Sequence, residues 1–201
     1  KIDDNIITAE SGVMLGKVVK ESIKHNLTGL EGLVGVPGTL GGAIMMNAGA
    51  WGAEISNYLI SVDIVSNNGE IKKLYPDDIE FKYRYSSFSS NEFILSAKFK
   101  LNKASRTEIN KRKLIASRGR IKSQPLKFRS AGSVFKNPHT KVAAGLLIDK
   151  VGLKGTRYGN AEISNHHANF FINHGNAKAL DIAKLIKISR KKVYEKFGIM
   201  L

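Results

Sequence analysis

Glycine is concentrated between residues 29 and 52, where eight of the nineteen glycines of the chain lie. Closely spaced glycines let backbone N–H groups approach a ligand and allow positive φ angles. Backbone donors of this kind suit a pyrophosphate. The segment is neither the G-x-G-x-x-G dinucleotide fingerprint nor a P-loop, because no such pattern opens a helix after a strand and no G-K-[ST] closes it. By itself it predicts either a phosphate-binding loop or a tightly turned structural loop.

The glycine-rich segment is the first of five motifs that follow one another along the chain. It contains Gly35-Val36-Pro37-Gly38, Gly41-Gly42 and Asn47-Ala48-Gly49-Ala50, and the later motifs are Tyr83-Arg84-Tyr85-Ser86-Ser87-Phe88, Ala131-Gly132-Ser133-Val134-Phe135-Lys136-Asn137-Pro138, Gly152-Leu153-Lys154-Gly155 and His167-Ala168-Asn169-Phe170. In this order, the motifs resemble those of the UDP-N-acetylenolpyruvoylglucosamine reductase family over nearly the whole chain. Five motifs in the right order are far more specific than any one of them.

The resemblance implies a redox reaction on a UDP-sugar enolpyruvyl ether. Bound FAD is reduced by NADPH, and its hydride then goes to the enolpyruvyl double bond, so that UDP-N-acetylmuramate is made for the bacterial cell wall. The carbon far from the carboxylate accepts the hydride, and the carbon beside the carboxylate accepts a proton. Negative charge spreads into the carboxylate between these events. The chemistry therefore needs a cation or hydrogen-bond donors at the carboxylate and a positioned proton donor at the carbon.

Arg84 and Ser133 stand where the family has its catalytic arginine and its proton donor. A guanidinium stays protonated and can hold a carboxylate through two parallel hydrogen bonds. A serine hydroxyl is a poor acid, but an enolate-like carbanion is a strong base, so a hydroxyl held in place can transfer its proton quickly. We expect both side chains to face one cleft between two lobes. Without their motifs, Arg84 would be interpreted as a surface arginine and Ser133 as a turn serine.

The resemblance also assigns residues to the cofactor and the substrate. The cofactor is assigned to Val36, Pro37, Gly38, Gly41, Gly42, Asn47, Ala48 and Gly49, and the substrate to Lys136, Asn137, Lys154 and His167. Lys154 is a candidate for the diphosphate. His166 and His167 sit where the family has a polar residue on the substrate side, and a structural role fits them equally. Two adjacent histidines without a further ligand make a poor metal site, so no metal is expected.

The sequence departs from the family pattern at both ends. The family begins with a subdomain whose Gly-Ser-Asn loop binds the FAD pyrophosphate, and it ends with a Leu-Glu-x-Glu-Val motif whose second glutamate is catalytic. Neither occurs in these 201 residues. We therefore expect the chain to be cut at both ends and inactive by itself. It also has no long tyrosine-bearing insertion between Leu101 and Gln124, which resembles the shorter of the family's two variants.

The net charge of +15 makes nucleic acid a partner to consider. The basic residues are spread over the chain, and the densest stretch, 106–127, has at most one aromatic neighbour, so it offers no stacking platform for bases. Two alternatives to the reductase stay open: another FAD-dependent oxidoreductase of the same superfamily, and a basic nucleic-acid-binding protein. The absence of cysteine, of a signal-peptide pattern and of a membrane-length apolar run fits a cytoplasmic protein. We expect a monomer without nucleic-acid or membrane partners.

Hydrophobic periodicity predicts the elements that must position these residues. The expected elements are a strand and an amphipathic helix within 6–26, a hairpin over 60–74 that turns at 67–69, a strand over 93–101, a basic helix over 105–122 that ends before Pro125, a helix over 142–151, a strand over 169–173, and a helix over 177–197 with Gly198 as its stop. In the strand over 93–101, the alternation predicts one buried face that carries Phe93, Leu95, Ala97, Phe99 and Leu101.

The mixture of helices and hairpins predicts an α+β fold in two parts. Residues 1–122 are expected to form the second lobe of a two-lobed FAD-binding domain. Residues 123–201 are expected to form an α+β substrate-binding domain.

Overall fold

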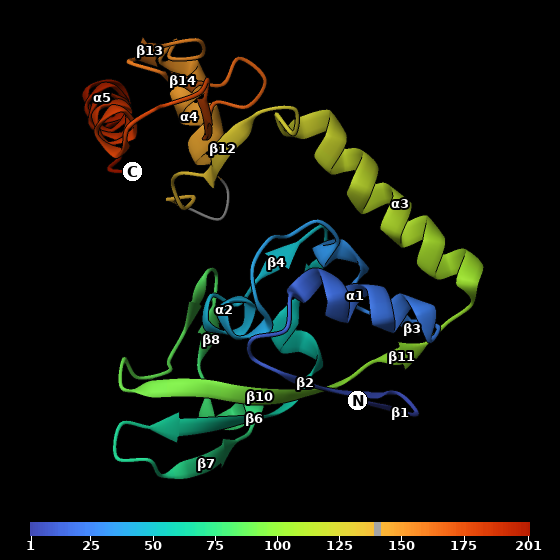
Figure 1. The fold of residues 1–201 in the computed structure, drawn as a ribbon. Coiled ribbons are helices and arrows are strands. Elements are labelled where there is room, and N and C mark those ends of the chain that lie inside the picture. Colours follow the sequence, from blue (N-terminus) through green and yellow to red (C-terminus); the bar gives the residue numbers. More distant parts are fainter. Residues whose placement is uncertain (139–141) are drawn as a thin grey trace. The chain divides into compact units, whose positions relative to one another are not determined.

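Helix α3 (Arg106–Ser123) contains the division between the two parts of the chain. The structure is a computed structural model that describes residues 1–138 and 142–201. It divides into two compact units, Lys1–Arg118 and Gly119–Leu201, each with its own strands and helices, so the predicted α+β class is confirmed (Figure 1). The domain boundary expected after residue 122 also falls within α3. In the part of the chain that the structure describes, no helix is long and apolar enough to cross a membrane.

The first unit is built on a five-stranded antiparallel sheet with the strand order β1-β2-β10-β6-β7. The strands are β1 (Ile2–Asp3), β2 (Ile6–Glu10), β10 (Glu92–Lys100), β6 (Leu59–Ser66) and β7 (Ile71–Leu74). The predicted hairpin is confirmed, because β6 pairs directly with β7. Its turn contains Gly69 at φ +83°, a conformation that glycine adopts without steric cost.

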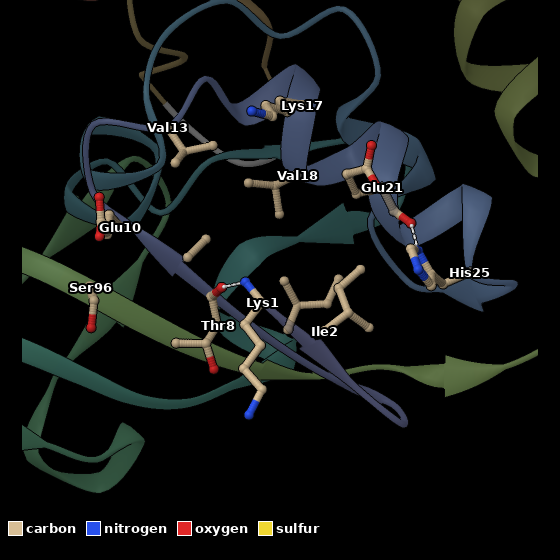
Figure 2. Close-up of a pocket in the computed structure, with 12 residues that line it drawn as sticks. Lys1, Ile2, Thr8, Glu10, Val13, Lys17, Val18, Glu21, His25 and Ser96 are labelled. Atoms are coloured by element: carbon tan, nitrogen blue, oxygen red, sulfur yellow. Dashed lines mark hydrogen bonds between the residues drawn. The ribbon is translucent and has the colours of Figure 1, made fainter.

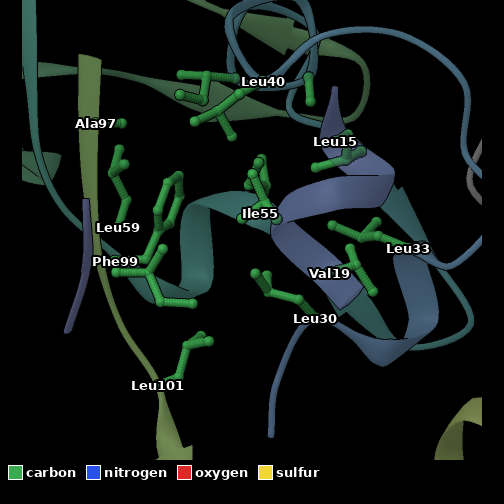
Figure 3. Close-up of a cluster of buried hydrophobic side chains, with 14 of the residues drawn as sticks. Leu15, Val19, Leu30, Leu33, Leu40, Ile55, Leu59, Ala97, Phe99 and Leu101 are labelled. Atoms are coloured by element: carbon green, nitrogen blue, oxygen red, sulfur yellow. The ribbon is translucent and has the colours of Figure 1, made fainter. Parts of the chain in front are cut away.

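Helices α1 (Leu15–Lys24) and α2 (Leu40–Met45) lie on one side of this sheet (Figure 1). The predicted amphipathic helix is confirmed: α1 buries Leu15, Val18, Val19 and Ile23 along one face. These side chains meet others from the sheet and the loops, and Figure 3 shows Leu15 and Val19 in the same cluster as Phe99 of β10. The sheet and the two helices thus share one hydrophobic core.

The first unit also contains short strands and 3-10 turns outside the five-stranded sheet. They are β3 (Leu27–Thr28), which pairs with β11 (Asn102–Lys103); the 3-10 turns η1 (Glu31–Leu33), η2 (Ile55–Tyr58) and η3 (Pro76–Asp78); the pair β4 (Gly49–Ala50) and β5 (Ala53–Glu54); and the hairpin β8 (Phe81–Lys82) and β9 (Tyr85–Ser86). Gly32 of η1 packs so closely on the next loop that a Cβ atom would lie 2.4 Å from the carbonyl oxygen of Ala50. A side chain at this position would therefore displace the 49–54 turn.

The predicted face of β10 is wrong in its first half. Phe93 and Leu95 are 59% and 38% exposed, whereas Phe99 is completely buried. The pairing of β10 with β6 shifts its register between Ile94 and Ser96, which is a β-bulge. Because side chains alternate between the two faces of a strand, one extra residue reverses the pattern. Ile94 therefore packs against the core in place of its two neighbours.

The second unit packs two helices on a four-stranded antiparallel sheet of strand order β12-β15-β14-β13. The strands are β12 (Arg129–Ser133), β15 (Phe170–Asn173), β14 (Ala161–Ile163) and β13 (Arg157–Tyr158), and the helices are α4 (Ala144–Lys150) and α5 (Ala179–Phe197). Ile148 of α4 and Leu185 of α5 share a buried cluster with Phe171 of the sheet. The predicted stop of the last helix is confirmed, since Gly198 takes φ +65° and donates its N–H to Tyr194.

A buried carboxylate braces this sheet. Glu162 of β14 is 5% exposed; its Oε2 accepts a hydrogen bond from Nε of Arg157 at 2.5 Å and lies 2.8 Å from Nε2 of His174. Burial raises the pKa of Glu162, but the hydrogen bonds and charges of Arg157 and His174 outweigh it and hold the pKa below its ordinary value. The charged carboxylate therefore stabilises the fold above its ordinary pKa, and that contribution is lost as the pH falls through the lowered value.

We expect Glu162→Gln to lower the free energy of unfolding by about 1–3 kcal/mol at pH 7, because a neutral amide cannot replace two hydrogen bonds made to a charged oxygen. The measurement is urea unfolding of the gene's full-length product. Glu195→Gln is the control: its carboxylate is 3.7–3.8 Å from two exposed lysines, and pairs of that kind contribute little. Equal stability of the two variants would contradict the bracing role of Glu162.

Candidate functional site

The residues that the sequence assigns to the cofactor lie in a loop, in α2 and in the turn after it. Val36, Pro37 and Gly38 belong to the loop between η1 and α2, Gly41 and Gly42 to α2, and Asn47, Ala48 and Gly49 to the turn and the start of β4. Most of the loop is exposed, and Asn47 is the buried member of the set. The assigned positions therefore form one continuous stretch on the surface of the first unit.

The loop before α2 offers backbone donors to a ligand. Gly35 and Gly38 take φ values of +75° and +111°, which L side chains rarely adopt. Gly38 and Thr39 are exposed. Within residues 1–138 and 142–201, no acceptor is in hydrogen-bonding position for the N–H groups of Gly35, Gly38 and Thr39. These N–H groups fit the needs of a phosphate.

The first turn of α2, by contrast, has its N–H groups in use. Those of Leu40 and Gly41 donate to the carbonyl oxygens of Val13 and Ser11 at 2.8 and 2.9 Å. A helix N-terminus binds an anion through N–H groups that have no partner within the protein. The loop, and not the end of α2, is thus the part of the segment that suits a phosphate.

A cavity of about 340 Å³ adjoins these residues. It is lined by Ser11, Gly12, Thr39, Gly41, Gly42, Met45 and residues 92–94. Ser11 and Gly12 were not identified from the sequence as site residues. The Ser-Gly pair is visible in the sequence, but its place beside α2 is set by the fold, in which the N–H of Gly41 donates to the carbonyl oxygen of Ser11 at 2.9 Å.

A second cavity of the first unit, of about 640 Å³, lies between α1 and the strands β1 and β2 (Figure 2). Its wall is apolar at Ile2, Val13 and Val18, and none of the residues assigned to the cofactor or to catalysis lines it. The dashed lines in Figure 2 join Lys1 to Thr8 and His25 to Glu21, both contacts within the fold. This cavity is therefore separate from the assigned site.

Asn47 braces the assigned segment from inside. It is 1% exposed, and its Nδ2 donates to Oε1 of Glu54 at 2.9 Å and to the carbonyl oxygen of Lys82 at 3.2 Å. Its Oδ1 accepts from the N–H of Ser56 at 3.4 Å. Asn47 also takes φ +41°, a region in which Asn is tolerated better than most residues. Its side chain thus joins β5, η2 and β8.

Arg84 lies in the two-residue turn of the β8–β9 hairpin. It takes φ +54°, which is uncommon for a residue other than glycine. Its Nη2 donates to the carbonyl oxygen of Gly49 at 2.7 Å, and its guanidinium carbon lies 5.0 Å from the centre of the Tyr83 ring. The guanidinium is therefore held against the segment that the sequence assigns to the cofactor.

Ser133 ends β12 in the second unit and is exposed. It is the strand partner of Phe170, and the register shifts between Ser130 and Ser133, where Gly132 takes φ +69°. The chain after Ser133 is held by Asn169, whose side chain exchanges two 2.9 Å hydrogen bonds with the backbone of Phe135. Asn169 belongs to the motif that begins at His167, but the motif by itself indicates no role for it. Its role in positioning the end of β12 follows from this contact.

Asn137 and His167 both contact the first turn of α4. Oδ1 of Asn137 accepts from the N–H of Ala144 at 3.1 Å. His167 packs against Gly145, where a Cβ atom would lie 3.0 Å from the imidazole, and its ring meets that of Phe170 at 4.9 Å. Because Phe170 is also the partner of Ser133, the second unit brings Ser133, Asn137 and His167 into one neighbourhood.

The two assigned lysines of the second unit differ in their surroundings. Lys154 forms an ion pair of 2.6 Å with Asp149, just beyond the last turn of α4. Lys136 is exposed, three residues after Ser133. No group of three or more metal-ligating side chains suited to an ion is found among the described residues.

We expect His167 to titrate below the ordinary histidine pKa of about 6.5. Burial lowers the pKa of His167 and outweighs a backbone hydrogen bond that raises it, and the charges of His166 and Lys154 lower it further. Nδ1 accepts from the N–H of Asn169 at 3.2 Å, so the neutral ring carries its proton on Nε2. Below pH 6.5 the unfolded chain takes up this proton before the folded one, so stability falls as the pH falls. NMR titration of the imidazole tests this; a pKa at or above 6.5 would contradict it.

Two known families match the chain on either side of α3. Residues 1–75 match the family described as FAD binding domain, and this range includes the whole glycine-rich segment. Residues 124–201 match the family described as UDP-N-acetylenolpyruvoylglucosamine reductase, C-terminal domain, and this range includes Ser133 and the four residues that the sequence assigns to the substrate. The class of protein is thus one in which a stretch of an FAD-binding domain precedes a reductase C-terminal domain.

Individual reductases match over almost the entire chain. That of Clostridium novyi is 44% identical over 200 residues, which cover 99% of this chain and 65% of the relative. The reductase of Pseudothermotoga lettingae is 42% identical, and the match covers 70% of its length. The crystal structure of the Thermus caldophilus reductase superimposes with a TM-score of 0.87 at 36% identity and covers 98% of this chain and 71% of its own.

The chain belongs to the UDP-N-acetylenolpyruvoylglucosamine reductase family. The resemblance drawn from the motifs is therefore confirmed, and the alternatives of another flavoprotein family and of a nucleic-acid-binding protein are set aside. The chain spans about 65% of the length of the Clostridium novyi and Caldicellulosiruptor bescii relatives.

Proposed function

We propose that this chain carries flavin-binding and substrate-binding residues of a cytoplasmic, monomeric enzyme that reduces UDP-N-acetylglucosamine enolpyruvate to UDP-N-acetylmuramate with NADPH, a step of peptidoglycan precursor synthesis. The observation that supports this most is the 2.7 Å hydrogen bond between Arg84 and Gly49. The guanidinium of Arg84 can bind a carboxylate, and this hydrogen bond places it against a segment that lies within the range matched by the FAD-binding domain. A reductase of this kind needs that proximity, because the reacting double bond is next to the carboxylate.

The loop and turn around α2 would hold FAD. The proposed contacts are Val36, Pro37, Gly38, Gly41, Gly42, Asn47, Ala48 and Gly49, with Asn47 acting through the scaffold that its buried side chain supports. The available N–H groups of the loop fit a cofactor that carries phosphates. FAD, when bound, supplies the hydride that it has received from NADPH.

Arg84 and Ser133 would act on the carboxylate and on the carbon beside it, the two places over which the negative charge is spread. The guanidinium of Arg84 binds the substrate carboxylate and stabilises the negative charge that spreads into it. The hydroxyl of Ser133 gives its proton to the carbon beside the carboxylate, which completes the saturation of the double bond. The exposed position of Ser133 leaves its hydroxyl accessible to a substrate.

The remaining assigned residues would hold the UDP-sugar. Lys136 and Lys154 bring positive charge, and Lys154 would share its ammonium between Asp149 and the diphosphate. Neutral His167 would donate from Nε2–H. Asn137 would line the site beside the first turn of α4.

We expect residues 1–201, expressed alone, to bind FAD weakly and to show no turnover. The relatives are longer than this chain, and the resemblance assigns the FAD pyrophosphate and a third catalytic residue to parts outside these residues. Part of a dinucleotide site still faces the entropic cost of association. The measurement compares flavin retention and NADPH-dependent turnover of the 201-residue segment with those of the gene's full-length product. Stoichiometric flavin and equal turnover in the segment would contradict this division of the site.

The experiment that tests the proposed function uses the full-length product. Bound oxidised flavin gives it visible absorbance, and NADPH oxidation should depend on added UDP-N-acetylglucosamine enolpyruvate, with UDP-N-acetylmuramate as the product. A colourless protein, or NADPH oxidation that is independent of this substrate, would contradict the proposal.

A further inference from the structure

The β8–β9 hairpin, which carries Arg84, is too short to hold its own position. Its strands contain two residues each, Phe81–Lys82 and Tyr85–Ser86. An isolated two-stranded hairpin is marginal at best in water, and one this short gains almost nothing from its own pairing. The position of Arg84 therefore depends on what ties the hairpin to the rest of the first unit.

One tie is a single hydroxyl. Oγ of Ser86 donates to the carbonyl oxygen of Met45, the last residue of α2, at 2.6 Å. Ser86 is 7% exposed, so water does not readily replace this bond. Met45 and the glycine that accepts from Arg84 are four residues apart. The hydroxyl thus fixes the hairpin beside the same turn that Arg84 contacts.

A second tie acts from the other strand. The amide of Asn47 donates to the carbonyl oxygen of Lys82 in β8, and the same amide donates to Glu54. The two strands of the hairpin are therefore attached on either side of Arg84, β8 through Asn47 and β9 through Ser86. Both attachments lead to the segment assigned to the cofactor.

We propose that Ser86 is a positioning residue that fixes the distance between Arg84 and the cofactor segment. This inference rests on the proposed function, in which Arg84 must hold the substrate carboxylate next to the flavin. Arginine has a long, flexible side chain, so the direction of its guanidinium depends on a fixed backbone. Ser86 supplies that fixed point without itself touching the substrate.

Ser86→Ala removes the hydroxyl and keeps the strand pairing, which uses backbone groups alone. In the full-length enzyme, kcat/KM for the enolpyruvyl substrate should fall about 10- to 100-fold, since a displacement near 1 Å can cost about 10²-fold. The rate of flavin reduction by NADPH and the amount of bound FAD should stay within about twofold. Ser87→Ala is the matched control: Ser87 is exposed, and its hydroxyl accepts from the N–H of Glu80, a residue outside α2.

A double-mutant cycle with Arg84→Ala shows whether Ser86 acts by positioning Arg84 or by stabilising the fold in general. If Ser86 acts through Arg84, Ser86→Ala has no further effect on kcat/KM once the guanidinium is absent. Should Ser86→Ala fail to retain FAD, the isosteric pair Ser86→Thr and Ser86→Val makes the same comparison. The threonine variant keeps the hydroxyl and should stay active, and the valine variant should not.

Equal losses from Ser86→Ala in the wild-type and Arg84→Ala backgrounds would overturn the inference, and so would an unchanged kcat/KM in the wild-type background. Equal losses from Ser86→Ala and Ser87→Ala would overturn it as well. A wild-type enzyme that binds FAD but does not reduce the enolpyruvyl substrate would instead overturn the proposed function, and the inference with it.

Discussion

Replacing Ser133 with alanine should slow the reoxidation of reduced flavin by the enolpyruvyl substrate about 10²- to 10⁴-fold, the usual cost of losing a general acid. Flavin reduction by NADPH should be unchanged, because no proton from Ser133 is needed in that half-reaction. The structure holds the backbone at this position: Ser133 ends β12, and Asn169 binds the backbone of Phe135 two residues after it. Stopped-flow traces of the flavin absorbance in the full-length enzyme measure the two half-reactions separately.

Ser130→Ala is the control for this experiment. Ser130 lies on the same strand and is exposed, and its hydroxyl accepts a 3.3 Å hydrogen bond from the N–H of Gly132. Its loss should change reoxidation by no more than about twofold. Unchanged reoxidation in Ser133→Ala, or equal slowing in both variants, would remove Ser133 from the mechanism.

Arg84→Lys should lower kcat/KM for the enolpyruvyl substrate about 10²- to 10³-fold, although the positive charge is kept. An ammonium cannot reproduce the planar fork that holds a carboxylate through two hydrogen bonds. Lysine at φ +54° has the same backbone cost as arginine, so folding should be little affected.

Steady-state kinetics with varied substrate test this prediction, together with a single-turnover measurement of flavin reduction by NADPH. The second rate should match that of the wild type. Arg106→Lys, at the start of α3 in the same unit, is the control and should behave like the wild type. Normal kcat/KM in Arg84→Lys would show that charge alone is needed at this position.

The sequence predicts the elements whose hydrophobic pattern is strong and local. Helices α1 and α5 and the β6–β7 hairpin have clear periodicity and recognisable ends, and all three are confirmed. Strand β12 has the sequence Arg-Ser-Ala-Gly-Ser, which contains no alternation, and pairing with β15 makes it a strand. The bulge in β10 also arises from pairing, so no pattern within β10 could reveal it.

In the candidate site, too, some features can be predicted from the sequence and others depend on tertiary contacts. The motifs identify Arg84 and Ser133 as residues that could do the chemistry. They do not reveal that Asn47 is buried, that the first-turn N–H groups of α2 are in use, or that Ser86 holds the hairpin. Each of these facts depends on contacts between segments that are distant in sequence, because backbone and side-chain partners are set by the tertiary fold.

A stopped-flow experiment can follow the proposed hydride transfer from the flavin to the enolpyruvyl substrate in a single turnover. The full-length product, loaded with FAD, is reduced anaerobically with one equivalent of NADPH and then mixed with UDP-N-acetylglucosamine enolpyruvate. We predict that the absorbance of oxidised flavin returns in a single turnover, with one equivalent of UDP-N-acetylmuramate formed per flavin. Flavin that stays reduced in the presence of this substrate, or that is reoxidised without forming the product, would contradict the account.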